Sequence, residues 1–258
     1  MAGETLYDDY YNSPREREWY DIGAEGKAEN VIRLCAPLKA ATVLDIGGGN
    51  GALLQKIHEG GIGQRLCVVE ISKSGLDQLH ERQKVMPALA EIKPFDGVHI
   101  PYPDDSFDLA ILSHVIEHVE HPRLLLLEAA RVARNLYAEV PLEDVAFRGN
   151  LRGDWVLDTT GHINYYTSDT FKRLLQTTAW KPRRVEVVPA SKKSHVFSQG
   201  SRGSAFYALK SVAIKTFPTM AQRVFSYHCA TLSERTSRVS ISIGDVLPPY
   251  PKRAEALR

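Results

Sequence analysis

The sequence predicts an α/β fold in which a doubly wound, mostly parallel sheet carries helices on both faces. Short apolar runs alternate with amphipathic segments along most of the chain, and these runs are apolar throughout. Such runs are typical of strands in a parallel sheet that is buried on both faces. A glycine-rich turn, GGGNG, directly follows the first run. In open α/β sheets, ligands bind at such turns, at the carboxyl ends of the strands.

Seven strands follow from the apolar runs, which are bounded by Gly, Pro or polar residues. They are expected at 42–46, 65–71, 88–92, 107–115, 135–141, 183–190 and 238–246. Helical spacing and capping residues predict helices between them. These are expected at 24–38, 50–58, 73–85, 121–133 and 168–179.

Three further segments exceed a minimal fold of this class. Residues 1–38 are expected to cap the ligand site, and 143–163 to form a long polar loop of the kind that often carries function. Residues 203–233 are expected to form two short helices broken at Phe217–Pro218. They would serve as a lid over the sheet or as a dimer surface, so a homodimer is an open alternative. The whole chain, 1–258, is expected to be one domain.

Composition favours a cytoplasmic globular enzyme. The 32 Lys and Arg balance 31 Asp and Glu, and a net charge of +1 argues against a nucleic-acid partner. No apolar run is long enough to span a membrane. The acidic, polar start of the sequence does not look like a signal peptide. Three dispersed cysteines are too few for a disulfide framework or a Cys-rich zinc site.

The turn Gly47–Gly51 leaves two ligand classes open. A dinucleotide-binding turn has the pattern GxGxxG, whose last position tolerates the alanine found at Ala52. However, Asp45 lies inside the strand, two residues before the glycines. A carboxylate there would repel a pyrophosphate and suit a ligand with a positive ammonium or sulfonium group. The turn therefore favours a cationic ligand over a dinucleotide.

With its neighbours, this turn resembles the first motif of class I S-adenosylmethionine-dependent methyltransferases. VLDIGGGNG matches that motif, Glu70 ends the second strand, and NLYAEVP is similar to the family's fifth strand. PYPDDSFDLAILSHVIEHVEHP resembles its fourth-strand segment. The likeness covers 42–141 well and 142–180 more loosely, and it is nearest the small-molecule, type 11-like group. It implies a Rossmann-like fold, the cofactor S-adenosylmethionine, and methyl transfer to an oxygen or nitrogen of a small acceptor.

The resemblance also implies a set of cofactor contacts. Glu70 would accept the ribose hydroxyls, Asp96 would meet the adenine amino group, and Ile71 would pack on the ring. Arg17 or Lys27 would neutralise the cofactor carboxylate, although each could equally be a solvated helix charge. In chain order the expected contacts are Tyr11, Arg17, Lys27, Asp45, Gly47, Gly49, Glu70, Ile71, Asp96, Gly97, Ser113 and His114.

His114, Glu117 and His118 form the pattern HxxEH, which also occurs in zinc peptidases. In the resembling family, some ubiquinone-type enzymes hold a divalent ion with ExxEH. Because the first position here is His, no metal site is predicted. Two interpretations are favoured over a metal site, which is the third and least favoured. They are a structural or cofactor-pocket role for Glu117 and His118, and a role as an acceptor-side base. His114 and His118 are candidate catalytic residues, since histidine titrates near neutral pH.

GHINYYT, at 161–167, resembles a segment that follows the fifth strand in many small-molecule and sugar or lipid methyltransferases. It would face the methyl group, with His162 as a further catalytic candidate; alternatively, it is a packed loop in which His162 caps a turn. The aromatic residues favour a small apolar or cationic acceptor. The expected acceptor contacts are Trp19, Trp155, His162, Asn164 and Tyr165.

Two alternative functions remain at this stage. A peptide, protein, or sugar- or lipid-linked acceptor would imply a recognition domain or a basic patch, and the sequence shows neither. The NPPY or DPPY motif of amino-group methylation is replaced after the fourth strand by SHVIEH. The other alternative is a non-catalytic or NAD-binding protein of the same fold.

Overall fold

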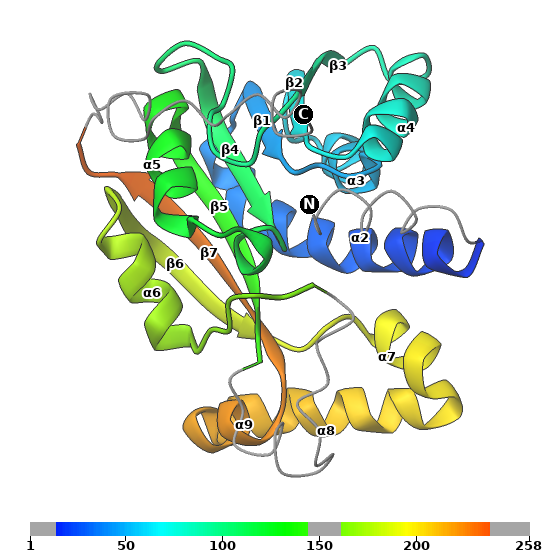
Figure 1. Ribbon diagram of the computed structural model, residues 1–258. Coiled ribbons are helices and arrows are strands. Elements are labelled where there is room, and N and C mark those ends of the chain that lie inside the picture. The colour runs from blue at the N-terminus through cyan, green and yellow to red at the C-terminus, as the bar shows by residue number, and fades with distance from the viewer. Residues whose placement is uncertain (1–13, 144–160, 238–258) are drawn as a thin grey trace, which may run out of the picture.

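The computed structural model describes residues 14–143 and 161–237, with side chains from residue 18 onward, and within these ranges seven strands form one sheet (Figure 1). The strand order is β3-β2-β1-β4-β5-β7-β6. Neighbouring strands are parallel except at β7, which runs antiparallel to both β5 and β6. The strands are β1 Thr42–Ile46, β2 Arg65–Glu70, β3 Leu89–Pro94, β4 Phe107–Ser113, β5 Ala133–Leu142, β6 Trp180–Val188 and β7 Tyr227–Arg235.

Helices connect these strands in the expected alternating order. The α-helices are α2 Pro14–Cys35, α3 Ala52–Glu59, α4 Lys73–Gln83, α5 Pro122–Val132, α6 Ser168–Gln176, α7 Lys192–Gln199, α8 Gly203–Thr216 and α9 Pro218–Val224. Short 3-10 turns are η1 Ala36–Leu38, η2 Ile116–His118 and η3 Gly200–Arg202. The predicted Rossmann-like class, with a seven-stranded and mostly parallel sheet, is confirmed.

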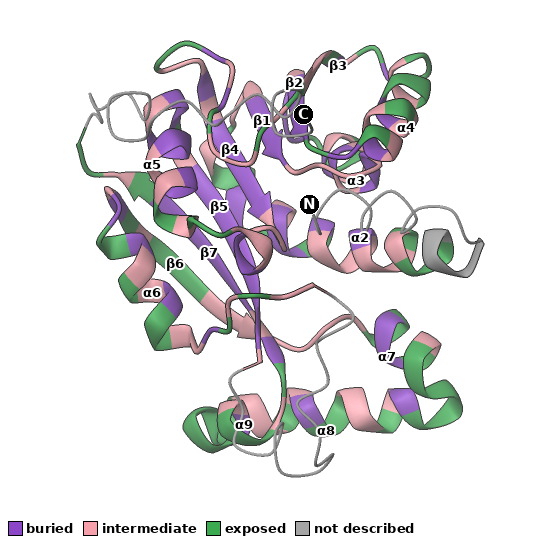
Figure 2. Cartoon of the chain, viewed as in Figure 1, coloured by how far each residue is buried: buried purple, intermediate pink, exposed green. Residues whose placement is uncertain are grey.

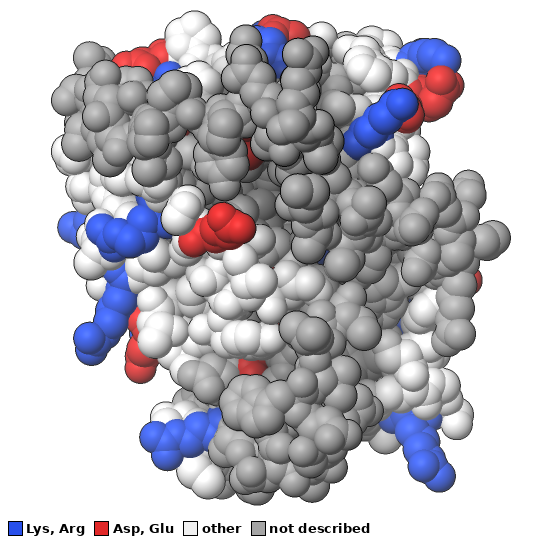
Figure 3. Space-filling model, viewed as in Figure 1, with Lys and Arg blue, Asp and Glu red and all other residues white. Residues whose placement is uncertain are grey.

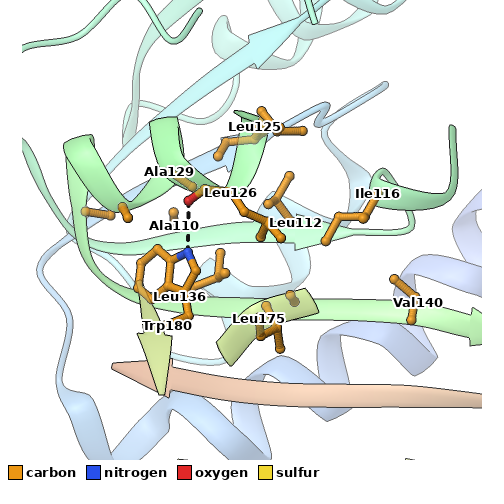
Figure 4. Packing of buried hydrophobic residues seen from close by; sticks show 14 of the residues in the cluster. Ala110, Leu112, Ile116, Leu125, Leu126, Ala129, Leu136, Val140, Leu175 and Trp180 are labelled. Atoms are coloured by element: carbon orange, nitrogen blue, oxygen red, sulfur yellow. Dashed lines mark hydrogen bonds between the residues drawn. The ribbon is translucent and has the colours of Figure 1, made fainter. Parts of the chain in front are cut away.

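Two hydrophobic clusters cover the two faces of the sheet, because successive strand residues point to opposite sides. Leu44 of β1 packs in the cluster that includes α5 and α6, whereas Val43 packs in the cluster that includes α2 and α3. Figure 2 shows the central strands buried and the outer faces of the helices exposed. In the first cluster, the indole Nε1 of buried Trp180 donates a hydrogen bond to the Leu126 carbonyl at 2.9 Å (Figure 4).

The carboxyl ends of β1 and β4 meet where the strand order reverses. β1 pairs with β2 on one side and with β4 on the other. Such a switch point opens a crevice for ligands. Helices α7, α8 and α9 lie beyond this edge of the sheet, at the bottom of Figure 1.

The prediction for 203–233 is wrong at its end. Residues Tyr227–Arg235 form strand β7 and not part of a second helix. Val224 and Phe225 do match helical spacing with His228, but the chain pairs between β5 and β6 from Tyr227 onward. Tertiary pairing therefore overrides a weak local pattern.

Other boundaries also differ from the sequence analysis. Helix α2 begins at Pro14 instead of residue 24. Helix α7, which follows the N-cap Ser191, was not predicted. The strand predicted at 238–246 lies outside the described residues. No helix in the described ranges combines the length and apolar character needed to cross a bilayer.

Candidate functional site

A cavity of about 980 Å³ lies at the carboxyl edge of the sheet. Its walls come from the glycine turn, from the ends of several strands, and from helices α2, α7 and α8. Sequence-predicted residues from distant segments meet here: Trp19, Lys27, Gly47, Glu70, Ile71, Gly97, His114, His118 and His162.

Other predicted contacts lie behind or beside this wall. The residues that do not line the cavity are Asp45, Gly49, Asp96, Ser113, Asn164 and Tyr165. Asn164 instead ties its loop to η2, since its Nδ2 donates to the carbonyls of Ile116 at 3.2 Å and Val119 at 2.7 Å. Tyr165 is half-exposed and donates to the His162 carbonyl. Tyr11, Trp155 and the side chain of Arg17 are outside the described part.

The glycine turn holds the end of β2 in place. Gly47 has a φ of 71°, and a Cβ there would lie 2.9 Å from Val115. The Gly49 N–H donates to Glu70 Oε2 at 2.8 Å. The other oxygen, Oε1, accepts from the N–H groups of Ile71 at 2.9 Å and Ser72 at 2.8 Å. The Glu70 carboxylate is thus fixed at the cavity wall, with lone pairs left for a ligand hydroxyl.

Asp45 lies under the turn with 2% of its surface exposed, and its Oδ2 has no hydrogen-bond partner in the described part of the chain. Burial and the negative charge of Glu70 raise the pKa of Asp45 to about 7, against the opposing attraction of Lys27. A cationic ligand near the turn would stabilise the ionised carboxylate.

At the next strand end, Asp96 and Gly97 form a tight loop. Asp96 Oδ1 accepts from the N–H groups of Val98 at 2.8 Å and His99 at 2.6 Å. Gly97, with a φ of 89°, brings backbone to the cavity wall. This arrangement leaves Asp96 exposed beside the cavity.

A buried charge cluster forms the floor of the cavity around Glu139, which is fully buried in β5. Its carboxylate lies 2.9 Å from His228 Nδ1 and 3.5 Å from His114 Nε2, and it also accepts from Asn30 and Tyr137. Burial opposes ionisation, yet the two neighbouring imidazoles hold the pKa of Glu139 well below its usual value.

The two imidazoles at Glu139 differ in protonation tendency. Burial and the Lys27 ammonium oppose protonation of His114, but the nearby carboxylates of Glu117 and Glu139 raise its pKa overall. Burial and the charge of His114 lower the pKa of His228 despite the same carboxylate. The pKa values of the two imidazoles are therefore shifted in opposite directions, although their ring centroids lie only 4.6 Å apart.

Sequence analysis missed both Glu139 and His228. Glu139 had a visible signal, since it is a charged residue inside an apolar strand, as Asp45 is. His228 had none, because its segment was expected to be helical.

A second histidine pair lies on η2 and the segment after residue 160. The Ile163 and Asn164 N–H groups donate to the Glu117 carbonyl, at 2.9 and 3.0 Å. This brings the rings of His118 and His162 to 4.7 Å between centroids. Their Nδ1 atoms lie 3.2 Å from the Gly161 carbonyl and 2.6 Å from Glu143 Oε2, respectively.

Two groups in the described ranges have ligand atoms within 4.8 Å of one another, as a metal site requires: His114, Glu139, His228, and Glu117, His118, His162. The positive charge of Lys27 lies near the first group. It lowers the pKa of both histidines and would oppose the binding of a second cation there. The prediction of no metal site stays a prediction.

A family model described as a methyltransferase domain matches residues 19–183. No curated protein matches the sequence significantly.

Solved structures share the fold at low identity. Geranyl diphosphate methyltransferase in complex with SAM is 11% identical, with a TM-score of 0.61, and 82% of this chain and 85% of that one are covered. The [4+2]-cyclase SpnF is 14% identical, with a TM-score of 0.59 over 82% and 81% of the two chains. A protein assigned as a sarcosine dimethylglycine methyltransferase of Galdieria sulphuraria is 15% identical, with a TM-score of 0.54 over 86% and 85%. At these identities the likeness concerns the fold alone.

Proposed function

The chain belongs to the methyltransferase-domain family, and from that premise we propose that it transfers a methyl group from S-adenosylmethionine to an oxygen or nitrogen of a small-molecule acceptor. The observation that carries the proposal is the cavity at the switch point. Its wall holds Gly47, Glu70 and Gly97 on one side and a cluster of ionisable side chains on the other.

The wall fits the cofactor on three structural grounds. Any side chain at Gly47 would press on Val115, so the turn offers only backbone to a ligand. Glu70 presents a carboxylate fixed by three N–H groups, which suits a ribose diol. Asp45 carries an unpartnered buried oxygen that a nearby positive charge would stabilise.

S-adenosylmethionine supplies a methyl group on a sulfonium centre, which leaves as a neutral thioether. The protein's own work is therefore to position the acceptor and, where the acceptor is protonated, to remove its proton. His228 is suited to that second task, because it is neutral, lines the cavity, and has its Nδ1 at the Glu139 carboxylate. A buried carboxylate on Nδ1 orients an imidazole and stabilises its protonated form.

This assignment modifies the sequence-based catalytic candidates. His114 is less suited to that task, because the carboxylates of Glu117 and Glu139 outweigh burial and the Lys27 charge and raise its pKa, which favours the protonated form. His118, on η2, and His162, in the segment before α6, also line the cavity, where they would contact the acceptor.

Label transfer tests the acceptor class. The full chain is incubated with S-adenosylmethionine carrying an isotopic label on its methyl group, with one pool of small hydroxyl and amine compounds and one pool of peptides. The proposal expects label in the small-molecule pool. Label in the peptides alone would overturn the acceptor assignment and leave methyl transfer standing.

A further inference from the structure

A second cavity, of about 360 Å³, adjoins the first between α7, α8 and the segment before β7. Trp19, Ala190, Ser194 and Ser226 line both cavities, so the two are neighbours across a shared wall. The remaining lining residues are His195, Ser198, Gln199, Phe206, Lys210, Val224 and Phe225.

Among the residues that line the smaller cavity, Lys210 is the only one of the types Lys, Arg, Asp and Glu. It is only 6% exposed, and within the described ranges its ammonium has no hydrogen bond and no ion pair. Its Nζ lies 5.0 Å from the centroid of the Tyr227 ring and 5.7 Å from that of the Phe206 ring.

A buried cation without a counter-ion is unfavourable unless a ligand pairs with it. Burial lowers the pKa of Lys210 to about 8, which leaves the amine mostly protonated at neutral pH. No carboxylate contributes to that shift, so the charge is uncompensated in this part of the molecule.

The rest of the wall suits an anion on an organic molecule. Ser226 and Gln199 carry hydroxyl and amide donors, and His195 is kept neutral because burial lowers its pKa. Phe206, Val224 and Phe225 add apolar surface. Ser226 is two residues from His228, the base in the first cavity. The shared lining residues thus place the smaller cavity next to the wall that carries His228.

We propose that the smaller cavity is a binding subsite for an anionic group of the methyl acceptor, a carboxylate or a phosphate, which pairs with the Lys210 ammonium. This inference rests on the proposed function, since it names the chemistry of the acceptor in the same site. The nucleophile of the acceptor then lies near His228, and its carbon part lies against the apolar wall. Among small acceptors, anionic ones are selected over cationic ones.

Calorimetric titration of the full chain with butyrate and with inorganic phosphate tests the subsite, with butyramide as a neutral probe. Butyrate or phosphate should bind, and the one that binds identifies the anion. Lys210→Met should weaken that binding at least tenfold, whereas Lys210→Arg should largely retain it. Lys192→Met is the matched control, because Lys192 is exposed on the neighbouring helix α7 and lines neither cavity; its effect should stay within twofold.

Butyramide binding as tightly as butyrate, no binding of either anion, or equal affinities in wild type and Lys210→Met would overturn the inference. Thermal unfolding checks that the Met variant folds. These outcomes are independent of cofactor binding. A chain that binds S-adenosylmethionine but no anion refutes the subsite alone, and a chain that binds anions at Lys210 without S-adenosylmethionine refutes the proposed function.

Discussion

Asp45 and Glu139 each place a buried carboxyl group inside an apolar strand, yet their surroundings act in opposite directions. Burial and the like charge of Glu70 raise the pKa of Asp45 to about 7, although the Lys27 charge opposes this rise. Burial also opposes ionisation of Glu139, but its two imidazole partners hold its pKa well below the usual value. A further cation, such as one on a ligand, would stabilise the ionised form of Asp45, whereas Glu139 already has imidazole partners.

Asp45 gives stability a distinct pH dependence in the cofactor-free protein. Its folded pKa of about 7 lies above the ordinary aspartate value of 3.8, so its stabilising contribution is present at low pH and is lost as the pH rises to 7. Between pH 5 and pH 8 the loss is roughly 2–3 kcal/mol at 1.36 kcal/mol per pKa unit. Asp45→Asn should remove this loss, as measured by urea unfolding at both pH values. Identical pH dependence in wild type and variant would contradict the assigned environment.

His228 is the residue on which turnover should depend most. His228→Asn keeps a hydrogen-bonding side chain at Glu139 but cannot take up a proton. Turnover of a hydroxyl or ammonium acceptor should fall by about 10²-fold or more, with S-adenosylmethionine affinity retained. Single-turnover label transfer measures the rate, and His121→Asn, at the exposed start of α5, serves as the control. Unchanged turnover in His228→Asn would remove His228 from the mechanism.

Among the elements, the core strands were predictable because their signals are local. β1 and β2 are short apolar runs bounded by glycine or polar residues, and the structure places them within one residue of expectation. Strand β7 was not predictable, because its register depends on two partner strands that are distant in sequence. Helix α7 was hidden for a similar reason. Ser194 and His195 of this helix are buried against the cavities, and that burial depends on packing with segments distant in sequence.

Helix α6 begins with a capping box. The Thr167 hydroxyl accepts from the Thr170 N–H at 3.1 Å, and the Thr170 hydroxyl accepts from the Thr167 N–H at 2.9 Å. Thr167→Ala should lower the free energy of unfolding by about 1 kcal/mol, measured in urea. Thr216→Ala, at the exposed end of α8, should change it by less than about 0.5 kcal/mol. A loss no larger than that of the control would contradict the cap.

At the scale of the whole molecule, the glycine turn and the acidic strand ends predicted which sheet edge carries the site. Gly47, Glu70 and Gly97 reach one cavity from three strand ends, as expected for a switch point. The opposite wall could not be predicted, because α7, α8 and the end of β6 reach it through tertiary packing alone. Lys210 accordingly reads in the sequence as an ordinary helix lysine, and only its burial distinguishes it.

Charge at this scale agrees with a small acceptor. On the face drawn in Figure 3, the Lys and Arg side chains of the described residues stand in small separate groups, without a continuous basic surface. The two lysines that we expect to act on ligands, Lys27 and Lys210, line cavities instead.

We predict that S-adenosylmethionine binds at the glycine turn, which calorimetric titration of the full chain with S-adenosylmethionine and with NAD can check. Gly47→Ala and Gly61→Ala form a matched pair. Both positions have positive φ, but a Cβ at Gly61 meets nothing within 4 Å, whereas one at Gly47 meets Val115. We expect wild type and Gly61→Ala to bind S-adenosylmethionine, and Gly47→Ala to bind it at least tenfold more weakly. Binding of NAD without S-adenosylmethionine, or equal affinity in the two variants, would contradict it.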